Sequence, residues 1–310
     1  SLAALLLAAA VGTASAADPP DALAAILRAH PEWFGEVLAR AGEHRLQILY
    51  TQIDRDAANR PVFRSFSFGL TDEYFYPAST VKLPAAVLAL EKLRDLAVPG
   101  LTRDTPLRIE AATAAQTAVD RDPSKADGLP TIAHYVKKVF LVSDNDAFNR
   151  LYAFLGQREI NERLWSRGFT DARILRRLEA ALDPEENRLT NPFVFFEGER
   201  VVHRQPLARN PGVLTNEARP GLRQGRGFMR DGLLVEQPFD FSQSNYLSVR
   251  SLQGILRSVL FPDAVPKRER FRLTEGDDRF LRTYMSMLPR ESTEPTYPDR
   301  QEHYDSYVKY

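Results

Sequence analysis

The spacing of apolar residues changes along the chain, and this change restricts the possible folds more than any other feature. Between residues 46 and 70, apolar and polar residues alternate in two segments, Leu46–Tyr50 and Phe66–Leu70, with a polar turn at Asp54–Pro61 between them. Such alternation predicts two strands of a hairpin. From Leu83 onward, apolar residues recur every three or four positions, as they do in helices. Strands followed by helices predict an α+β fold.

Two strands alone make a marginal sheet, so we expect further strands elsewhere in the chain. The segment Phe193–Val202 is expected to form a second hairpin that turns at Glu197–Glu199. Residues 203–245 are rich in Gly, Pro, Arg and Asn, and we expect a lid or insertion over residues 195–245. The apolar spacing predicts helices over residues 20–41 (broken at Pro31 and ending at Gly42), 83–93, 132–140, 148–155 and 252–260.

Composition excludes several classes of function. The chain of 310 residues carries 41 basic and 41 acidic residues, and this neutral balance argues against a nucleic-acid-binding protein. There is no cysteine, which excludes thiol catalysis and thiolate metal sites. The five histidines are scattered and show no metal-ligand spacing. We therefore expect neither a metal nor another cofactor.

The start of the sequence resembles part of a signal peptide. An apolar run, Leu2–Val11, precedes Ala14-Ser15-Ala16, which has the form of a cleavage site. The run is too short to span a membrane, and no other segment resembles a span. An ordinary Ala-rich helix is the alternative. We expect residues 1–16 to be a signal remnant, residues 17–310 to be one hydrolase domain, and the protein to be periplasmic or secreted.

Ser79 and Lys82 form an S-x-x-K pattern at the start of the helix that runs through Leu93. Residues three apart on a helix share one face. A serine hydroxyl needs a nearby base to act as a nucleophile, and a lysine whose pKa is lowered by burial can be that base. The alternative is a capping serine beside a solvated lysine.

Ser143-Asp144-Asn145 forms a second motif, in a loop between two predicted helices. The loop can present a hydroxyl and an amide to one wall of a cleft. The alternative is a helix cap, because Ser, Asp and Asn are the favoured capping residues.

Together and in this order, the two motifs resemble the signature of class A β-lactamases and penicillin-binding proteins. Tyr76–Leu93 resembles the nucleophile helix of this family, and Val139–Gly156 resembles its second motif with the following helix. The resemblance covers about residues 45–195. It implies an antiparallel sheet flanked by helices, together with an all-α lobe.

Glu179 and Asp183 resemble two positions of the family's Ω-loop, and Thr190–Pro192 resembles the end of that loop. The resemblance implies that Glu179 activates the water that releases the acyl-enzyme. Asp183 stands where the family has Asn, which puts fast deacylation in doubt. The alternative for Glu179 is a solvated charge on a helix.

The family's K-T-G element is not found, because no Lys is followed two residues later by Gly. Arg223-Gln224-Gly225 is the nearest imitation, but no strand pattern surrounds it and we do not accept it. We expect the sequence to stop before this element and the last strands, and a divergent relative is the alternative. In agreement, Tyr304–Tyr310 reads as the uncapped start of a helix.

The resemblance implies a serine hydrolase that acts through an acyl-enzyme on a small-molecule β-lactam. Ser79 is then the nucleophile, Lys82 its base, Ser143 a proton relay, Asn145 a substrate-binding residue and Glu179 the base for deacylation. The alternatives are a penicillin-binding D,D-peptidase or esterase acting on cell-wall peptide, and an inactive relative that only binds such peptide.

Overall fold

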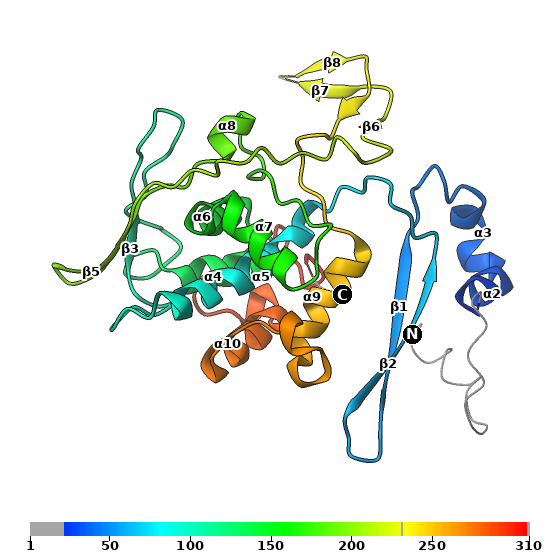
Figure 1. Cartoon of the computed structure of the whole chain (residues 1–310), viewed down its shortest axis with the longest axis horizontal. Helices are drawn as coiled ribbons and strands as arrows, with labels where there is room; N and C mark the ends of the chain where they lie inside the picture. The colour runs from blue at the N-terminus through cyan, green and yellow to red at the C-terminus, as the bar shows by residue number, and fades with distance from the viewer. Residues whose placement is uncertain (1–21, 231, 309–310) are drawn as a thin grey trace. The chain divides into compact units, whose positions relative to one another are not determined.

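The computed structural model describes residues 22–230 and 232–308. The predicted signal remnant, residues 1–16, lies outside this part. The chain divides after Thr71 into two compact units, and Figure 1 shows their elements. The described residues form nine α-helices and several small antiparallel sheets, so the α+β class is confirmed. The single hydrolase domain over residues 17–310 stays a prediction.

The first unit contains two short helices and the predicted hairpin. Pro31 separates the helices, because it lacks an N–H to continue the first and suits the first position of the second. The side chain of Asp56 accepts hydrogen bonds from the N–H groups of Ala58 and Arg60, which fixes the hairpin turn. Both strands lie closer to this turn than predicted, and Leu46 and Leu70 fall outside them. The elements are α2 (Ala22–Ala29), α3 (Pro31–Ala39), β1 (Ile48–Arg55) and β2 (Pro61–Phe68).

A buried helix, α4 (Lys82–Leu96), forms the centre of the second unit. Ten of the fifteen residues of α4 are buried, including the charged Lys82 and Glu91. It packs against α5 (Ile132–Val142), α6 (Asn145–Leu155) and α7 (Gln157–Ser166). A three-stranded sheet in the order β3–β4–β5 adds aromatic side chains to this core, and its strands are β3 (Leu107–Ile109), β4 (Phe193–Glu197) and β5 (Arg200–Gln205).

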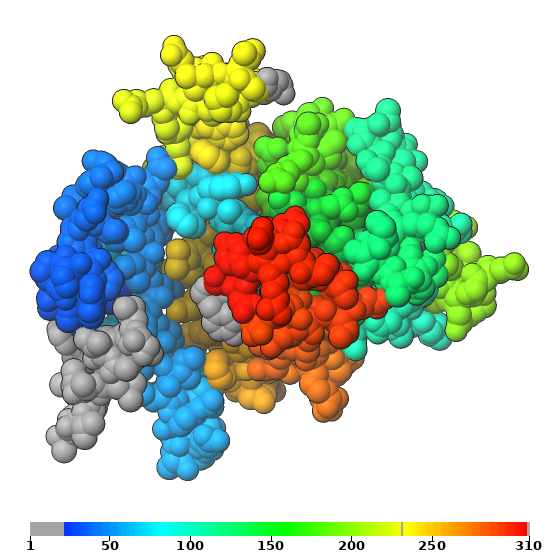
Figure 2. Space-filling view, turned by 180° about the vertical axis from the view of Figure 1, so that it is seen from behind, coloured from blue at the N-terminus to red at the C-terminus, as the bar shows by residue number. Residues whose placement is uncertain are grey.

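The predicted insertion contains short strands that the sequence did not reveal. We expected no strand around Arg223-Gln224-Gly225, but the first two of these residues pair with Phe239–Asp240. Ladders of two or three residues are too short to show an alternating pattern. Figure 2 shows this segment (yellow) projecting from the second unit. Its strands are β6 (Arg223–Gln224), β7 (Phe228–Arg230), β8 (Leu233–Val235) and β9 (Phe239–Asp240).

The later part of the chain adds helices that cover the core. The predicted helix at 252–260 is present as α9 (Val249–Leu260), whereas α8 (Pro184–Asn187) and α10 (Glu275–Ser286) were not predicted. The expected helix start at Tyr304–Tyr310 is wrong for the described residues, because 304–308 form turns. None of the described helices is both long and apolar enough to cross a bilayer.

A buried carboxylate ties this later part to α4. Glu91 is fully buried and makes ion pairs with Arg163, Arg167 and Arg272. It also accepts a hydrogen bond of 2.8 Å from the backbone N–H of Arg272. A buried charge is tolerated only when its lone pairs are occupied in this way. Glu91 thereby fixes residue 272 beside the central helix.

We predict that Glu91→Ala lowers the free energy of unfolding by about 3–5 kcal/mol, because the largely buried Arg163 and Arg167 lose their shared partner. Urea unfolding followed by circular dichroism measures this change. The control is Glu162→Ala, which removes an exposed i,i+4 pair with Arg158 and should change the stability by less than about 0.5 kcal/mol. Equal effects of the two variants would contradict this role of Glu91.

Candidate active site

Ser79 lies in a 3₁₀ turn, Ala78–Val81, that leads directly into α4. Pro77 fixes the chain before the turn, and its carbonyl accepts hydrogen bonds from the N–H and the hydroxyl of Thr80. Ser79 is exposed, whereas Lys82 is only 3% exposed. The predicted position of Ser79 and Lys82 at a helix start is confirmed.

The ammonium group of Lys82 is the point where the two sequence motifs meet. Its Nζ lies 3.0 Å from Ser79 Oγ, 2.9 Å from Ser143 Oγ and 2.6 Å from Asn145 Oδ1. Nζ also donates to the backbone carbonyl of Ser143. The structure thus brings together four of the five predicted site residues. A proton can move between the two hydroxyls through one nitrogen.

The S-D-N loop, Ser143–Asn145, ends α5 and begins α6. Ser143 has a left-handed backbone, with a φ of 56°, and its N–H donates to Lys138 O. Asp144 caps α6 by accepting a hydrogen bond of 2.7 Å from the N–H of Ala147. The capping interpretation therefore holds for Asp144, while the side chains of Ser143 and Asn145 face Lys82. Capping thus describes Asp144, and presentation of side chains to the site describes Ser143 and Asn145.

The environment of Lys82 makes its ammonium group a stronger acid than an ordinary lysine. Burial lowers its pKa to about 8, because a charged ammonium is poorly solvated inside the protein. The carboxylates of Asp144 and Glu179 oppose this shift, because negative charge stabilises the protonated form. Burial is the larger influence. A substantial fraction of the amine is therefore free to accept a proton at mildly basic pH.

Glu179 lies in a loop and not on a helix, and a solvated charge stays the alternative to a catalytic role. Its backbone is left-handed, with a φ of 50°, and the residue is exposed. No other described residue makes a hydrogen bond to its carboxylate. Glu179 lines a cavity of about 310 Å³ together with Asp146, Asn149 and Arg150. It influences Lys82 through space, without direct contact.

Asparagine side chains hold the backbone of the loop that leads to Glu179. Asn149, for example, accepts from the N–H of Leu178 and donates to its carbonyl, both at 2.8 Å. Asn245 accepts from the N–H groups of Leu175 and Arg176. Amides suit this task because each both donates and accepts. The four residues that act in this way, which we call the asparagine clamps, are Asn149, Asn161, Asn187 and Asn245.

The sequence analysis did not identify the asparagine clamps. Asn149 lies one helical turn after Asn145, and this spacing is a signal that it shares a face with the site. Asn245 is 70 residues away from its partner Leu175 in the sequence, and no local pattern connects them.

Asp183, which stands where the resemblance implies Asn, is engaged in a capping box. Its carboxylate accepts from the N–H of Glu186, and the Glu186 carboxylate accepts from the N–H of Asp183, both at 2.8 Å. The residue therefore begins the short helix α8. A carboxylate held in this way has little freedom to orient a water molecule at Ser79.

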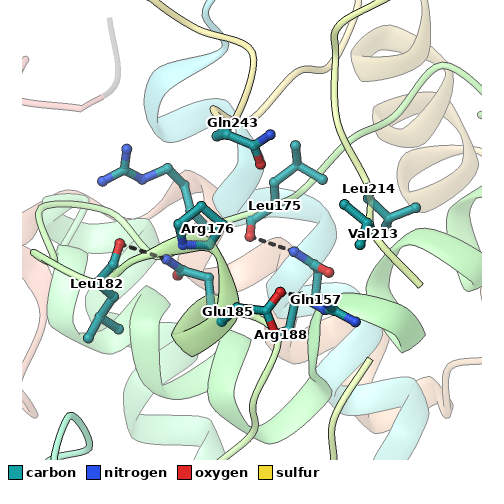
Figure 3. Close-up of a pocket in the computed structure, with 11 residues that line it drawn as sticks. Gln157, Leu175, Arg176, Leu182, Glu185, Arg188, Val213, Leu214 and Gln243 are labelled. Carbon is teal, nitrogen blue, oxygen red and sulfur yellow. Dashed lines mark hydrogen bonds and ion pairs between the residues drawn. The ribbon is translucent and has the colours of Figure 1, made fainter. Parts of the chain in front are cut away.

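A second cavity lies beside the same loop but contains none of the predicted site residues. It has a volume of about 150 Å³. Figure 3 shows Arg176, Leu182 and Val213 among its lining, and the Gln157 amide bound to the Leu175 carbonyl. This cavity therefore does not mark the predicted site. The described residues contain no group of three or more His, Asp or Glu side chains placed to hold a metal ion.

Comparison with known proteins agrees with this geometry. The profile of the Beta-lactamase enzyme family matches residues 38–194, just over half of the chain. The chain belongs to the beta-lactamase enzyme family. Membership suggests a serine hydrolase of the penicillin-binding fold. All five predicted site residues fall within the matched region. No curated protein matches the chain.

We predict that Lys82 titrates near pH 8, and that Glu179→Gln lowers its pKa further by removing a negative charge. NMR of protein labelled with ¹⁵N at Nζ measures the titration, and Lys82→Arg assigns the signal by its loss. The control is Asp146→Asn, which lines the same cavity as Glu179. A Lys82 that stays fully protonated above pH 9.5 contradicts the prediction.

Proposed function

We propose that the protein hydrolyses β-lactam amides through an acyl-enzyme on Ser79. The observation that carries the proposal is the buried Lys82 amine, 3.0 Å from Ser79 Oγ and 2.9 Å from Ser143 Oγ. A serine and a base in this contact are the arrangement that activates a hydroxyl. Membership of the beta-lactamase enzyme family supports the same reaction.

In the acylation step, Ser79 Oγ attacks the carbonyl carbon while its proton passes to neutral Lys82. A backbone N–H at the start of the turn, that of Ser79, stabilises the negative oxygen. Lys82 passes the proton to Ser143, and Ser143 gives its own to the nitrogen that leaves as the C–N bond breaks. An ester on Ser79 results, and Lys82 is neutral again. Asn145 Oδ1 is occupied by Lys82, so its amide N–H₂ is left to bind the substrate.

In the deacylation step, Glu179 removes a proton from water as the water oxygen attacks the ester. The bond between the carbonyl carbon and Ser79 Oγ then breaks, and Oγ receives the proton that Glu179 took from the water, so that Ser79 and the Glu179 carboxylate are both restored. The carboxylate of Glu179, which makes no hydrogen bond with another described residue, supports this role. The proposal also places the protein in the periplasm or outside the cell, with the apolar run Leu2–Val11 and Ala14–Ala16 as its support.

A penicillin-binding D,D-peptidase or esterase is the second candidate. It is favoured by the capping box of Asp183, which removes one ligand for the hydrolytic water. Such an enzyme forms the same acyl-enzyme but releases it slowly. A relative that only binds cell-wall peptide is the third possibility, and covalent labelling of Ser79 excludes it.

We predict that Ser79→Ala abolishes labelling by a fluorescent penicillin, with a loss of more than about 10³-fold. The melting temperature should change little, because Ser79 is exposed. In-gel fluorescence and mass spectrometry of the labelled peptide measure the effect. Ser166→Ala, an exposed serine at the end of α7, is the matched control. Undiminished labelling of Ser79→Ala is incompatible with the proposal.

We predict that Glu179→Gln slows deacylation by about 10²–10⁴-fold, the usual contribution of a general base, while acylation continues. The acyl-enzyme should accumulate as a burst in the hydrolysis of a chromogenic cephalosporin. Asp146→Asn, in the same cavity, should keep normal turnover. If the wild-type acyl-enzyme already persists and Glu179→Gln changes nothing, the penicillin-binding alternative is favoured.

A further inference from the structure

Lys138 holds the S-D-N loop with both its backbone and its side chain. It lies in the second half of α5, and its carbonyl accepts from the N–H groups of Ser143 and Asp144. Its Nζ lies 3.3 Å from the carboxylate of Asp144 and 3.2 Å from that of Asp122. The side chain is only 13% exposed. A partly buried ammonium thus bridges two carboxylates, one of them in the predicted site motif.

Asp122 is a fixed anchor for this bridge. Its Oδ1 accepts from the hydroxyl of Ser124 at 2.6 Å and from the N–H of Ser124 at 3.0 Å. Burial alone would raise the pKa of Asp122, but His134, Ser124 and Lys138 together hold it well below its usual range. The carboxylate is therefore charged at any pH at which the protein is studied.

Asp144 interacts with two lysines whose pKa values shift in opposite directions, Lys82 downward and Lys138 upward. Asp144 raises the pKa of Lys82, whereas burial lowers it. Burial would also lower the pKa of Lys138, but Asp144 and Asp122 outweigh it and raise that pKa. Lys138 therefore stays protonated and compensates the charge of Asp144. The other titratable groups around this cluster are His134, Tyr135, Asp146, Arg150, Glu179 and Tyr297.

We propose that Lys138 is a positioning residue of the active site. It is anchored on Asp122 and pairs with Asp144. This pairing fixes the S-D-N loop and screens Lys82 from the negative charge of the Asp144 carboxylate. The assignment extends the proposed function, because screening matters to a reaction in which Lys82 must be neutral. Loss of the Lys138 charge leaves Asp144 uncompensated. Lys82 then holds its proton more tightly and is a poorer base at neutral pH.

The experiment is an NMR titration of the Lys82 Nζ in the full chain with Lys138→Met, a variant that removes the charge and keeps most of the side chain. We expect the inflection for Lys82 to rise by about one pH unit, the lower end of the effect of a close charge. At pH 7 the neutral fraction of Lys82, and with it the labelling rate of Ser79, then falls about tenfold.

Three variants separate this role from a merely structural one. Lys138→Arg keeps the charge and should titrate as wild type. Lys137→Met alters the neighbouring lysine, which contacts Tyr284 and the carbonyl of Glu294 instead, and should also leave Lys82 unchanged. Asp144→Asn keeps a good helix cap without the charge. In the Asp144→Asn background, where the pKa of Lys82 should itself be lower, Lys138→Met should cause little change, because the two residues act on Lys82 through one interaction.

An unchanged inflection in folded Lys138→Met overturns the proposal, and so does an equal rise in Lys138→Arg or in the Asp144→Asn background. If Lys138→Met does not fold, Lys138→Gln serves instead, because its amide can still donate to both carboxylates. The titration does not depend on turnover. A wild-type protein that no penicillin labels contradicts the proposed hydrolase, while the Lys82 titration still decides the role of Lys138.

Discussion

The burial of the Lys82 amine is the constraint on which the site depends. An ammonium in the protein interior is costly unless oxygen atoms surround it. Here the oxygens come from the turn before α4 and from the loop that joins α5 to α6. These segments are therefore held in one arrangement by the same group that gives the site its base. Stability and reactivity have a common origin in this side chain.

The loop with Glu179 differs from the Lys82 site, because its backbone is held in place but its functional side chain has no hydrogen-bond partner among the described residues. Its backbone is fixed by the asparagine clamps, whereas the carboxylate at its tip makes no hydrogen bond with the described residues. The left-handed backbone of Glu179 persists because the residues before it are held on several sides. A fixed backbone with an unpaired side chain suits a group that must bind a transient partner such as water.

The sequence predicted those parts of the structure that depend on neighbours in the chain. The strongly periodic helices α4, α5, α6 and α9 and the S-x-x-K turn are local, and their spacing alone places Ser79 beside Lys82. Helices α7 and α10 were missed because charged and polar residues interrupt their apolar spacing. The contact of Lys82 with the S-D-N loop followed only from the family resemblance. Contacts made by Asn245 and Glu91 bridge distant segments, and no local pattern encodes them.

The asparagine clamps have a consequence for how this protein can vary. They bind main-chain atoms of residues 174–178, and every residue type except proline offers the same N–H and carbonyl. The loop is therefore free to change its side chains, subject to size and polarity where they are buried. The clamps have less freedom, because a charged side chain lacks the paired donor and acceptor, and the amide of Gln stands one methylene farther from its own backbone. Mutational tolerance should thus be high along the loop and low at the distant residues that hold it.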